Sequence, residues 1–323
     1  MTATHRTTRP HRPWTRRWPR FRHLLLATFA VVLASPGGAA ELQFAFEHGG
    51  ENRQYLLYAP ASYTPGTALP LVVVLHGRPS TAARMAKLTA FNQRAEANDF
   101  LVVYPQGQNS FWNYLYGLGE ANSQPDDPGF VLAVLSHVMA SHSVDADRIY
   151  VAGISNGGFM AQRLACEYRG VFAAFASVAA TGYAYMPEEC RTRGPVSMLY
   201  IHGTADGKVP WQGLSIPGDG GTRRPVTLSM MDSVKYWSAR AECARDITRQ
   251  RVASVAAESR THVVRMVSRN CAENRVVELF AVMGGGHNWP GVEGVIPARI
   301  AGEVNLDIHA SDVIWSFFRD KRR

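Results

Sequence analysis

One short segment limits the choice of fold more than any other part of the sequence. The apolar run at residues 148–152 has the length of a β-strand, and it leads through Gly153-Ile154-Ser155-Asn156-Gly157 into residues typical of a helix. A serine between two such glycines occupies a sharp strand-to-helix turn, in which only small neighbours fit close to its backbone. The helix behind the turn directs N–H groups toward negative charge that develops there. The segment therefore predicts a reactive Ser155 at the end of a buried strand.

The apolar segments around this turn predict an α/β protein. Runs rich in Val, Ile and Leu, without alternation of polar and apolar residues, are typical of parallel strands that helices cover on both faces. Segments of helix length fall between several of these runs. We therefore expect a mostly parallel central sheet with helices on both faces. The expected strands are residues 55–59, 71–75, 100–104, 148–152, 175–179, 197–201 and 276–282, and the expected helices are residues 83–97, 130–142, 157–168, 228–239 and 311–319.

The first 40 residues have the composition of an export signal. Arginines come first, an apolar run follows at residues 24–34, and the segment ends in Ser35-Pro36-Gly37-Gly38-Ala39-Ala40, which is the order of regions in a signal peptide. The apolar run is too short to cross the roughly 30 Å core of a bilayer as a helix, so a membrane anchor is not expected. We predict that residues 1–40 are a signal peptide cleaved near Ala40. Residues 41–323, which show no internal repeat or linker, are then one domain, free of the membrane, in the periplasm or the medium.

The net charge of +8 would suggest a nucleic-acid partner if it were spread over the chain. However, residues 1–40 contain seven arginines and no acidic residue, so the charge of residues 41–323 falls to +1. A nucleic-acid partner is therefore not expected. The sequence carries no indication of an oligomeric state.

Four cysteines remain after the expected cleavage, in a chain that leaves the reducing cytoplasm, which favours disulfide bonds. Three pairings are possible. If nearest neighbours pair, Cys166 joins Cys190. Cys243 then joins Cys271, and each short loop would stabilise the fold by about 3 kcal/mol. A zinc site is the alternative, but no Cys-x-x-Cys pair or histidine spacing supports it, so neither a metal nor another cofactor is expected.

A serine hydroxyl needs a base to remove its proton, and the base needs an acid to orient it. On a fold of this kind the acid and then the histidine follow the serine along the chain. Asp206 lies just after the strand expected at 197–201, and His287 follows the strand expected at 276–282, within a glycine-rich loop. Strand ends of open α/β sheets are where ligands and catalytic groups gather. We therefore expect Ser155, Asp206 and His287 to form a catalytic triad.

The negative charge on a substrate oxygen needs two N–H donors, which form an oxyanion hole. The N–H of Asn156 is one expected donor, and the N–H of Arg78, after the strand at 71–75, is the other. The side chain of His76 is expected to hold that loop by hydrogen bonds rather than to act as a second base. His202 is expected to be structural. Asp127 precedes Pro128 and is expected to cap the next helix.

Several motifs together make residues 41–323 resemble the secreted esterase family that contains polyhydroxybutyrate depolymerase-like and feruloyl esterase-like enzymes. The matching stretches are Leu75-His76-Gly77, Val103-Tyr104-Pro105-Gln106-Gly107, Asp127-Pro128-Gly129-Phe130, Val144-Asp145-Ala146-Asp147-Arg148-Ile149-Tyr150-Val151, Gly153-Ile154-Ser155-Asn156-Gly157-Gly158, His202-Gly203-Thr204-Ala205-Asp206 and Gly285-Gly286-His287-Asn288-Trp289-Pro290-Gly291. The resemblance implies the α/β-hydrolase fold, Ser155 as nucleophile, His287 as base and then acid, and Asp206 as the orienting carboxylate. It also implies disulfide bonds of the kind considered above.

Two features of the sequence concern the substrate. The family often has a cysteine after the His-Gly pair, whereas this chain has Arg78-Pro79. This cation at the mouth of the pocket either favours an anionic or carbonyl-rich substrate or only shapes the loop. Trp112, Trp211 and Trp289 are candidate substrate contacts, because flat rings stack on cinnamoyl groups or sugars. Their alternative role is packing in the core.

We therefore expect a secreted serine carboxylic-ester hydrolase that forms an acyl-enzyme on 3-hydroxybutyrate-type oligomers (3-hydroxyalkanoates) or similar esters. One alternative is a feruloyl or acetylxylan esterase that acts on plant cell-wall esters. A peptidase with the same triad is disfavoured, because no segment of the size of an added propeller or large cap is present. A non-catalytic extracellular binding protein with the same fold is disfavoured by the complete set of three triad residues in the expected order.

Overall fold

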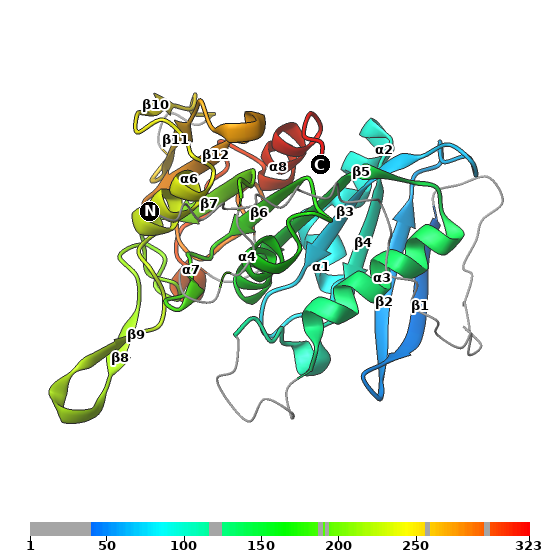
Figure 1. Ribbon diagram of the computed structural model, residues 1–323. Coiled ribbons are helices and arrows are strands. Elements are labelled where there is room, and N and C mark those ends of the chain that lie inside the picture. Colours follow the sequence, from blue (N-terminus) through cyan, green and yellow to red (C-terminus); the bar gives the residue numbers. More distant parts are fainter. Residues whose placement is uncertain (1–39, 116–124, 187–189, 191–193, 256–258, 294–297) are drawn as a thin grey trace, which may run out of the picture.

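The computed structural model describes residues 40–115, 125–186, 190, 194–255, 259–293 and 298–323. Its centre is a ten-stranded sheet with the strand order β1-β2-β4-β3-β5-β6-β7-β12-β11-β10 (Figure 1). The predicted signal peptide lies outside the described residues, apart from Ala40, at which β1 begins. In the part of the chain that is described, no helix has the length and apolar character needed to span a bilayer.

The middle of the sheet is parallel and its two margins are antiparallel. The parallel strands are β4 (Leu101–Pro105), β3 (Leu69–Leu75), β5 (Val144–Ile154), β6 (Ala174–Val178), β7 (Met198–Gly203) and β12 (Val277–Met283). The antiparallel strands are β1 (Ala40–His48) and β2 (Glu51–Ala59) at one margin, and β11 (His262–Ser268) and β10 (Ile247–Arg251) at the other. The expected strands and the mostly parallel sheet are confirmed, whereas β1, β10 and β11 were not predicted.

Helices cover both faces of the sheet, as the apolar strands predict. One core contains buried residues of α3 (Asp127–Ser141), α4 (Asn156–Tyr168) and α6 (Met230–Arg240), and Figure 1 shows α3 and α4 in front of the sheet. The opposite core contains buried residues of α1 (Ala82–Thr89), α2 (Phe91–Asn98) and α8 (Ala310–Phe318). In β3, Val73 belongs to the first core and its neighbours Val72 and Val74 belong to the second. The strand needs apolar residues at every position because both of its faces are buried.

The single helix expected at residues 83–97 is two helices. Ala90 has a φ of 50°, so the chain turns there through the left-handed region between α1 and α2. The break allows Phe91, at the start of α2, to be fully buried in the core beneath the helices. No glycine or proline marks this break, so the sequence pattern predicted one continuous helix.

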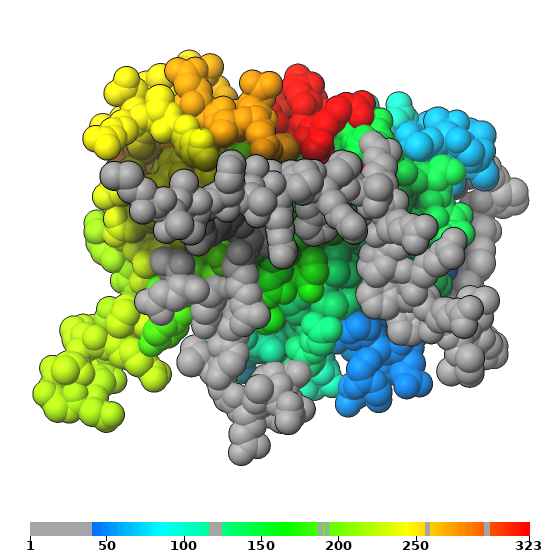
Figure 2. Space-filling view, in the orientation of Figure 1, coloured from blue at the N-terminus to red at the C-terminus, as the bar shows by residue number. Residues whose placement is uncertain are grey.

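The shorter elements lie mainly in the connections between strands. A hairpin of β8 (Ser215–Pro217) and β9 (Arg223–Pro225) follows β7 and protrudes from the body of the molecule at the lower left of Figures 1 and 2. A four-residue helix, α7 (Ala298–Ala301), precedes α8, and 3₁₀ turns lie at Gln108–Ser110, Asp219–Gly221 and Ala272–Asn274.

Two disulfide bonds join nearest neighbours along the chain. Cys166, near the end of α4, is bonded to Cys190, and Cys243, just after α6, is bonded to Cys271. The nearest-neighbour pairing is confirmed, and no cysteine is left free.

The prediction that Asp127 caps α3 is wrong, because its neighbour Asp126 does so. Asp126 Oδ1 accepts the N–H of Gly129 at 2.9 Å. Asp127 is instead fully buried and pairs with Arg53 at 2.6 Å, while its other oxygen accepts the N–H of Asn113 at 2.7 Å. The Asp127 carboxylate therefore joins α3 to β2 and to the loop that contains Trp112 and Asn113.

We expect this buried ion pair to be sensitive to the loss of one charge. In Asp127→Asn the Arg53 cation stays buried without its counter-charge, and the free energy of unfolding should fall by about 3–5 kcal/mol. Urea unfolding followed by tryptophan fluorescence measures the change. The paired replacement Arg53→Met with Asp127→Leu should recover most of the loss, since it removes both charges. An Asp127→Asn variant as stable as the wild type would contradict this account.

Candidate active site

The three predicted triad residues follow strands that are close together in the parallel part of the sheet. Ser155 follows β5, Asp206 follows β7 and His287 follows β12, with β6 between the first two strands. The pairing register aligns the ends of these strands, because one row across the sheet contains Ile154, Val178, Ile201 and Phe280. The carboxyl ends therefore lie at one edge of the sheet, and the turn and loops that carry these residues leave the sheet there.

Ser155 has a strained backbone at a sharp strand-to-helix turn. Its φ is 54° and its ψ is −120°, a conformation that non-glycine residues rarely adopt and that costs about 1–3 kcal/mol. The surrounding structure holds it there: its N–H donates to the Val178 carbonyl at 2.8 Å, and its carbonyl accepts the N–H of Phe159 at 3.0 Å. Between residues 149 and 162, Ser155 alone is partly exposed. The strained turn thus brings one hydroxyl to the surface of an otherwise buried segment.

The two glycines beside Ser155 are required by close contacts of the backbone. A Cβ on Gly153 would lie 2.2 Å from the carbonyl oxygen of Gly157. A Cβ on Gly157 would lie 2.4 Å from the carbonyl oxygen of Leu75, at the end of β3. Any side chain at these positions would therefore push α4 away from the sheet and move the serine.

Asp206 and His287 form the hydrogen bond that the triad hypothesis requires. His287 Nδ1 lies 2.7 Å from Asp206 Oδ2, and Asp206 Oδ1 accepts the backbone N–H groups of Lys208 and Val209, each at 2.8 Å. Burial alone would raise the pKa of Asp206, but the hydrogen bond from His287 and the N–H groups outweigh it, so the pKa lies below its ordinary value. Asp206 is therefore ionised at neutral pH and oriented to accept the proton on Nδ1.

The loop that contains His287 is held by direct backbone contacts. A Cβ on Gly203 would lie 2.2 Å from the carbonyl oxygen of Gly285, and that oxygen accepts the N–H of Ala205 at 2.9 Å. The N–H of His287 donates to the carbonyl of Ala301 in α7. The Asp206 and His287 loops are therefore packed together through glycines, without an intervening side chain.

A second histidine lies beside Asp206. His202 is buried, and its Nε2 donates to the Val209 carbonyl at 2.9 Å while lying 3.8 Å from Asp206 Oδ2. Burial lowers the pKa of His202 to about 4, so the ring is neutral at pH 7. Its bond to Val209 closes the turn whose N–H groups hold Asp206. This agrees with the expected structural role.

His76 has the loop-holding role expected of it. Its Nε2 accepts the N–H of Gly107 at 2.9 Å, so Nδ1 carries the proton and donates to the Gly77 carbonyl at 2.8 Å. Burial lowers the pKa of His76, which favours this neutral form. A Cβ on Gly77 would lie 3.4 Å from the Cβ of Ser155, so the loop that leads to Arg78 runs directly past the serine.

Asn156, the expected oxyanion donor, lies directly after Ser155 at the start of α4. It is the first residue of α4, so its N–H has no acceptor within the helix. Its side chain fixes the neighbouring loop: Oδ1 accepts the N–H of Trp112 at 2.6 Å, and Nδ2 donates to the Trp112 carbonyl at 3.0 Å. The sequence analysis missed this positioning role of the Asn156 side chain, because nothing in the sequence links it to a loop 44 residues earlier.

Two of the three tryptophans expected to contact substrate do not face a pocket. Trp112 has an exposed fraction of 0% and donates from its indole to the His76 carbonyl at 2.9 Å. Trp289 is 2% exposed and donates to the Ser311 hydroxyl at 3.2 Å. Both predictions of substrate contact are wrong, because these rings are packing groups behind the site. Trp211 is partly exposed, with its ring 6.0 Å from that of His202, and stays a candidate.

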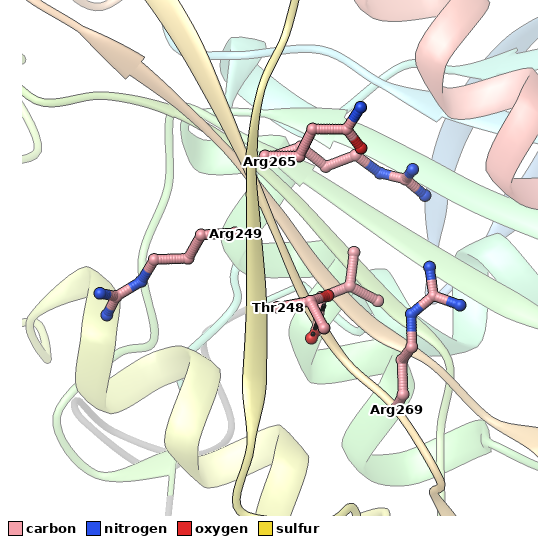
Figure 3. Close-up of a pocket in the computed structure, with 6 residues that line it drawn as sticks. Thr248, Arg249, Arg265 and Arg269 are labelled. Carbon is pink, nitrogen blue, oxygen red and sulfur yellow. Dashed lines mark hydrogen bonds between the residues drawn. The ribbon is translucent and has the colours of Figure 1, made fainter.

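A separate hollow of about 350 Å³ lies on the antiparallel margin of the sheet. Figure 3 shows Arg265 and Arg269 on one side of the strands with Thr248, while Arg249 points away from them. This arrangement follows from the alternation of side chains along β10 and β11. β11 and β12 separate β10 from β7, so the hollow is not formed by the triad loops. Among the described residues, no group of three or more His, Cys, Asp or Glu side chains is arranged to hold a metal ion.

Comparison with solved structures defines the class of protein. The chain matches an acetyl xylan esterase from Aspergillus awamori with a TM-score of 0.54 and 13% identity, over 86% of this chain and 98% of that one. It matches a thermostable esterase with a TM-score of 0.52 and 19% identity, over 88% of this chain and 63% of that one. At such low identity these matches concern the fold alone. The chain has the α/β-hydrolase fold.

Comparison of sequences then defines the family. Residues 53–186 match the family described as "Esterase PHB depolymerase". A protein of Nocardia uniformis subsp. tsuyamanensis that is named as an esterase, NocK, is 32% identical over 277 residues, which cover 83% of this chain and 79% of NocK. This chain belongs to the polyhydroxybutyrate depolymerase esterase family, and it is a serine esterase.

Two further relatives are similar over a smaller part of their length. Poly(3-hydroxyalkanoate) depolymerase C of Paucimonas lemoignei is 34% identical over 175 residues, which are 50% of this chain and 40% of that protein. Feruloyl esterase B of Thermothelomyces thermophilus is 30% identical over 148 residues, which are 45% of this chain and 50% of that protein. The chain thus spans half the length of these two relatives or less.

Because His202 is buried, we expect the stability of the fold to depend on pH. Burial holds its pKa at about 4 in the folded protein, against 6.5 when it is exposed. The unfolded chain therefore binds more protons between these two values, and the free energy of unfolding should fall as the pH is lowered through this window. His202→Gln removes the titrating group. Its curve should be flatter than that of the wild type by up to about 1.4 kcal/mol per pH unit.

Urea unfolding at several pH values measures this difference. His262→Gln, at the start of β11 and away from the triad, is the matched control, because it removes a histidine that is not fully buried. If the His202→Gln curve has the same slope as the wild-type curve, the burial of a neutral His202 is refuted.

Proposed function

We propose that this esterase is an exported carboxylic-ester hydrolase that cleaves 3-hydroxyalkanoate oligomers by acyl-enzyme chemistry. The observation that carries the proposal is the position of Ser155. It is strained, partly exposed, and at the same edge of the sheet as the hydrogen-bonded pair Asp206 and His287. Strain of this kind persists where the surrounding structure holds it, and it is concentrated at functional sites.

In the proposed reaction His287 acts first as base and then as acid. Its Nδ1 is directed at Asp206, which leaves Nε2 as the atom that takes the proton from the Ser155 hydroxyl. The serine oxygen attacks the ester carbonyl, and the ionised Asp206 stabilises the imidazolium that forms. The imidazolium then gives its proton to the leaving alkoxide, and an acyl-enzyme results. A water molecule repeats the sequence, releasing the acid and regenerating the serine.

Two backbone N–H groups stabilise the negative charge that develops on the carbonyl oxygen of the substrate. The N–H of Asn156 is at the first position of α4, where the helix dipole adds to its effect. The N–H of Arg78 is the second, on the loop that passes the serine. Loss of one such donor typically costs about 2.7–4 kcal/mol of transition-state stabilisation.

The buried tryptophans favour an aliphatic substrate over a feruloyl ester. A feruloyl pocket depends on stacking against exposed rings, and of the three candidates only Trp211 is partly exposed. The family description and the relative named as a poly(3-hydroxyalkanoate) depolymerase support 3-hydroxyalkanoates as the substrate class. The relatives named as feruloyl esterases keep plant cell-wall esters as the alternative.

Export is proposed from the disulfide bonds and the leader together. Disulfides persist in oxidising compartments, and this chain has two. A signal peptide at residues 1–40 would deliver the protein to the periplasm or the medium, and residues 41–323 would act there as one domain. The continuous sheet from β1 to β10 supports a single domain.

Removal of the Ser155 hydroxyl tests the proposal. The full chain is expressed with its leader, and the purified enzyme is assayed on a soluble 3-hydroxybutyrate trimer and, side by side, on methyl ferulate. We expect faster cleavage of the trimer, and a rate lower by about 10⁴-fold or more in Ser155→Ala, because the acyl-enzyme cannot form.

Ser136→Ala is the matched control, because Ser136 is exposed on α3. The melting temperatures of both variants should stay near that of the wild type. Comparable turnover by Ser155→Ala would refute the assigned nucleophile, and Ser155-dependent preference for methyl ferulate would replace the 3-hydroxyalkanoate assignment with the cell-wall one.

A further inference from the structure

We propose that Arg78 and Phe111 form a binding site for a substrate carboxylate beside the nucleophile. This esterase would then prefer esters in which a free carboxylate lies a few bonds from the scissile ester. The inference rests on the function proposed above and adds to it the charge of the substrate. It starts from Arg78, an exposed arginine on the loop that follows β3.

The backbone that carries Arg78 is fixed next to Ser155. Gly77 is the residue before Arg78, and a Cβ on Gly77 would lie 3.4 Å from the Cβ of Ser155. Two hydrogen bonds hold this stretch: the His76 carbonyl accepts the indole N–H of Trp112 at 2.9 Å, and the Gly77 carbonyl accepts from the His76 ring at 2.8 Å. Arg78 therefore directly follows Gly77, the residue that lies beside the nucleophile, on a loop that these hydrogen bonds hold in place.

Phe111 is held in place by hydrogen bonds of the chain around it. The next residue, Trp112, has both its N–H and its carbonyl bonded to the side chain of Asn156, which directly follows the serine. The N–H of Phe111 itself donates to the Gln108 carbonyl at 3.0 Å. Phe111 is thus linked to the nucleophile through Trp112 and Asn156, and it is partly exposed.

These two side chains contact one another at the surface. The Arg78 guanidinium carbon lies 4.9 Å from the centre of the Phe111 ring. A cation over an aromatic face is attracted by the ring electrons, and the contact restricts the motion of the long arginine side chain. A guanidinium held in this way still presents N–H groups at its edge, in a planar fork that matches a carboxylate.

Among the residues that the structure describes, no acidic side chain pairs with the positive charge of Arg78. Arg78 is exposed, and no carboxylate of the described residues forms an ion pair with it. Arg163 on α4 differs, because it is paired with Glu167 at 2.9 Å. The Arg78 cation is therefore available to a ligand that enters beside Ser155.

A hydroxyalkanoate oligomer provides a carboxylate in a suitable place. Its last unit bears a free carboxylate on the alcohol side of the terminal ester, a few bonds from the ester oxygen. Arg78 would anchor this end, so the enzyme would release one hydroxy acid at a time from short chains. Such an enzyme consumes the products of a hydrolase that cuts longer polyesters. A monoester of a dicarboxylic acid offers the same carboxylate on the acyl side.

Two pairs of esters that differ in one charge test the proposal. The first pair is the 3-hydroxybutyrate trimer as free acid and the same trimer with its carboxyl group as primary amide, which places the charge on the alcohol side. The second pair is mono-p-nitrophenyl glutarate and p-nitrophenyl butyrate, which places the charge on the acyl side. The quantity measured is the ratio of kcat/KM for the anionic ester to kcat/KM for the neutral ester of the same pair.

We expect the wild-type ratio to be about 10 or more for at least one pair, since a tenfold preference corresponds to one well-placed charge interaction of about 1.4 kcal/mol. Arg78→Gln should bring that ratio close to 1, mainly through a higher KM for the anionic ester. Arg78→Lys should retain part of the preference, because the cation stays and the fork is lost. Phe111→Leu should lower the ratio to an intermediate value, and added salt should lower the wild-type ratio.

Arg84→Gln is the matched control, because Arg84 is an exposed arginine of the neighbouring helix α1. It should leave the ratios unchanged, and melting curves should show that each variant is folded. Wild-type ratios near 1 for both pairs, or ratios that Arg78→Gln does not alter, would overturn the carboxylate site while the esterase function stands. Absence of Ser155-dependent hydrolysis of all four esters would overturn the proposed function and this inference with it.

Discussion

The close approach of β3, the Ser155 turn and the start of α4 is the constraint on which the site depends. Backbone carbonyls lie where the Cβ atoms of Gly153 and Gly157 would be, so strand and helix meet with no side chain between them. That contact holds Ser155 at a positive φ, and the bond from its N–H to Val178 secures the turn to β6. The strain energy of this conformation is small compared with the stabilisation that comes from burying apolar side chains on both faces of the sheet.

The same principle applies to the other half of the site. Gly203 and Gly285 allow the loops after β7 and β12 to touch through their backbones, and this contact aligns Asp206 with His287. His202 closes the turn behind Asp206, while His76, Trp112 and Asn156 lock the loops in front of the serine. Buried polar groups thus set the geometry, while Ser155 is partly exposed and Arg78 is exposed on the adjoining loop.

Prediction from the sequence succeeded where a short pattern has one structural meaning. A run of Val, Ile and Leu buried on two faces identified the parallel strands, and Gly-x-Ser-x-Gly after such a strand identified the sharp strand-to-helix turn at Ser155. Prediction failed where no local signal exists. Nothing marks the left-handed Ala90 that divides α1 from α2, and β10 has mostly exposed, polar residues because it is an edge strand. The capping of α3 was assigned one residue too late because Asp126 and Asp127 are adjacent.

The sequence by itself determined the order in which the expected catalytic residues follow one another along the chain. Local backbone preferences and glycine positions specify the strand-to-helix turn, and the periodicity of apolar residues specifies a sheet covered on both faces. Only the tertiary structure decided which side chains are reachable. Trp112 and Trp289 are buried, Asp127 pairs with Arg53 across 74 residues, and Arg78 projects over Phe111 without an acidic partner among the described residues. Burial and pairing depend on contacts between distant segments, and one segment's sequence does not contain its neighbours.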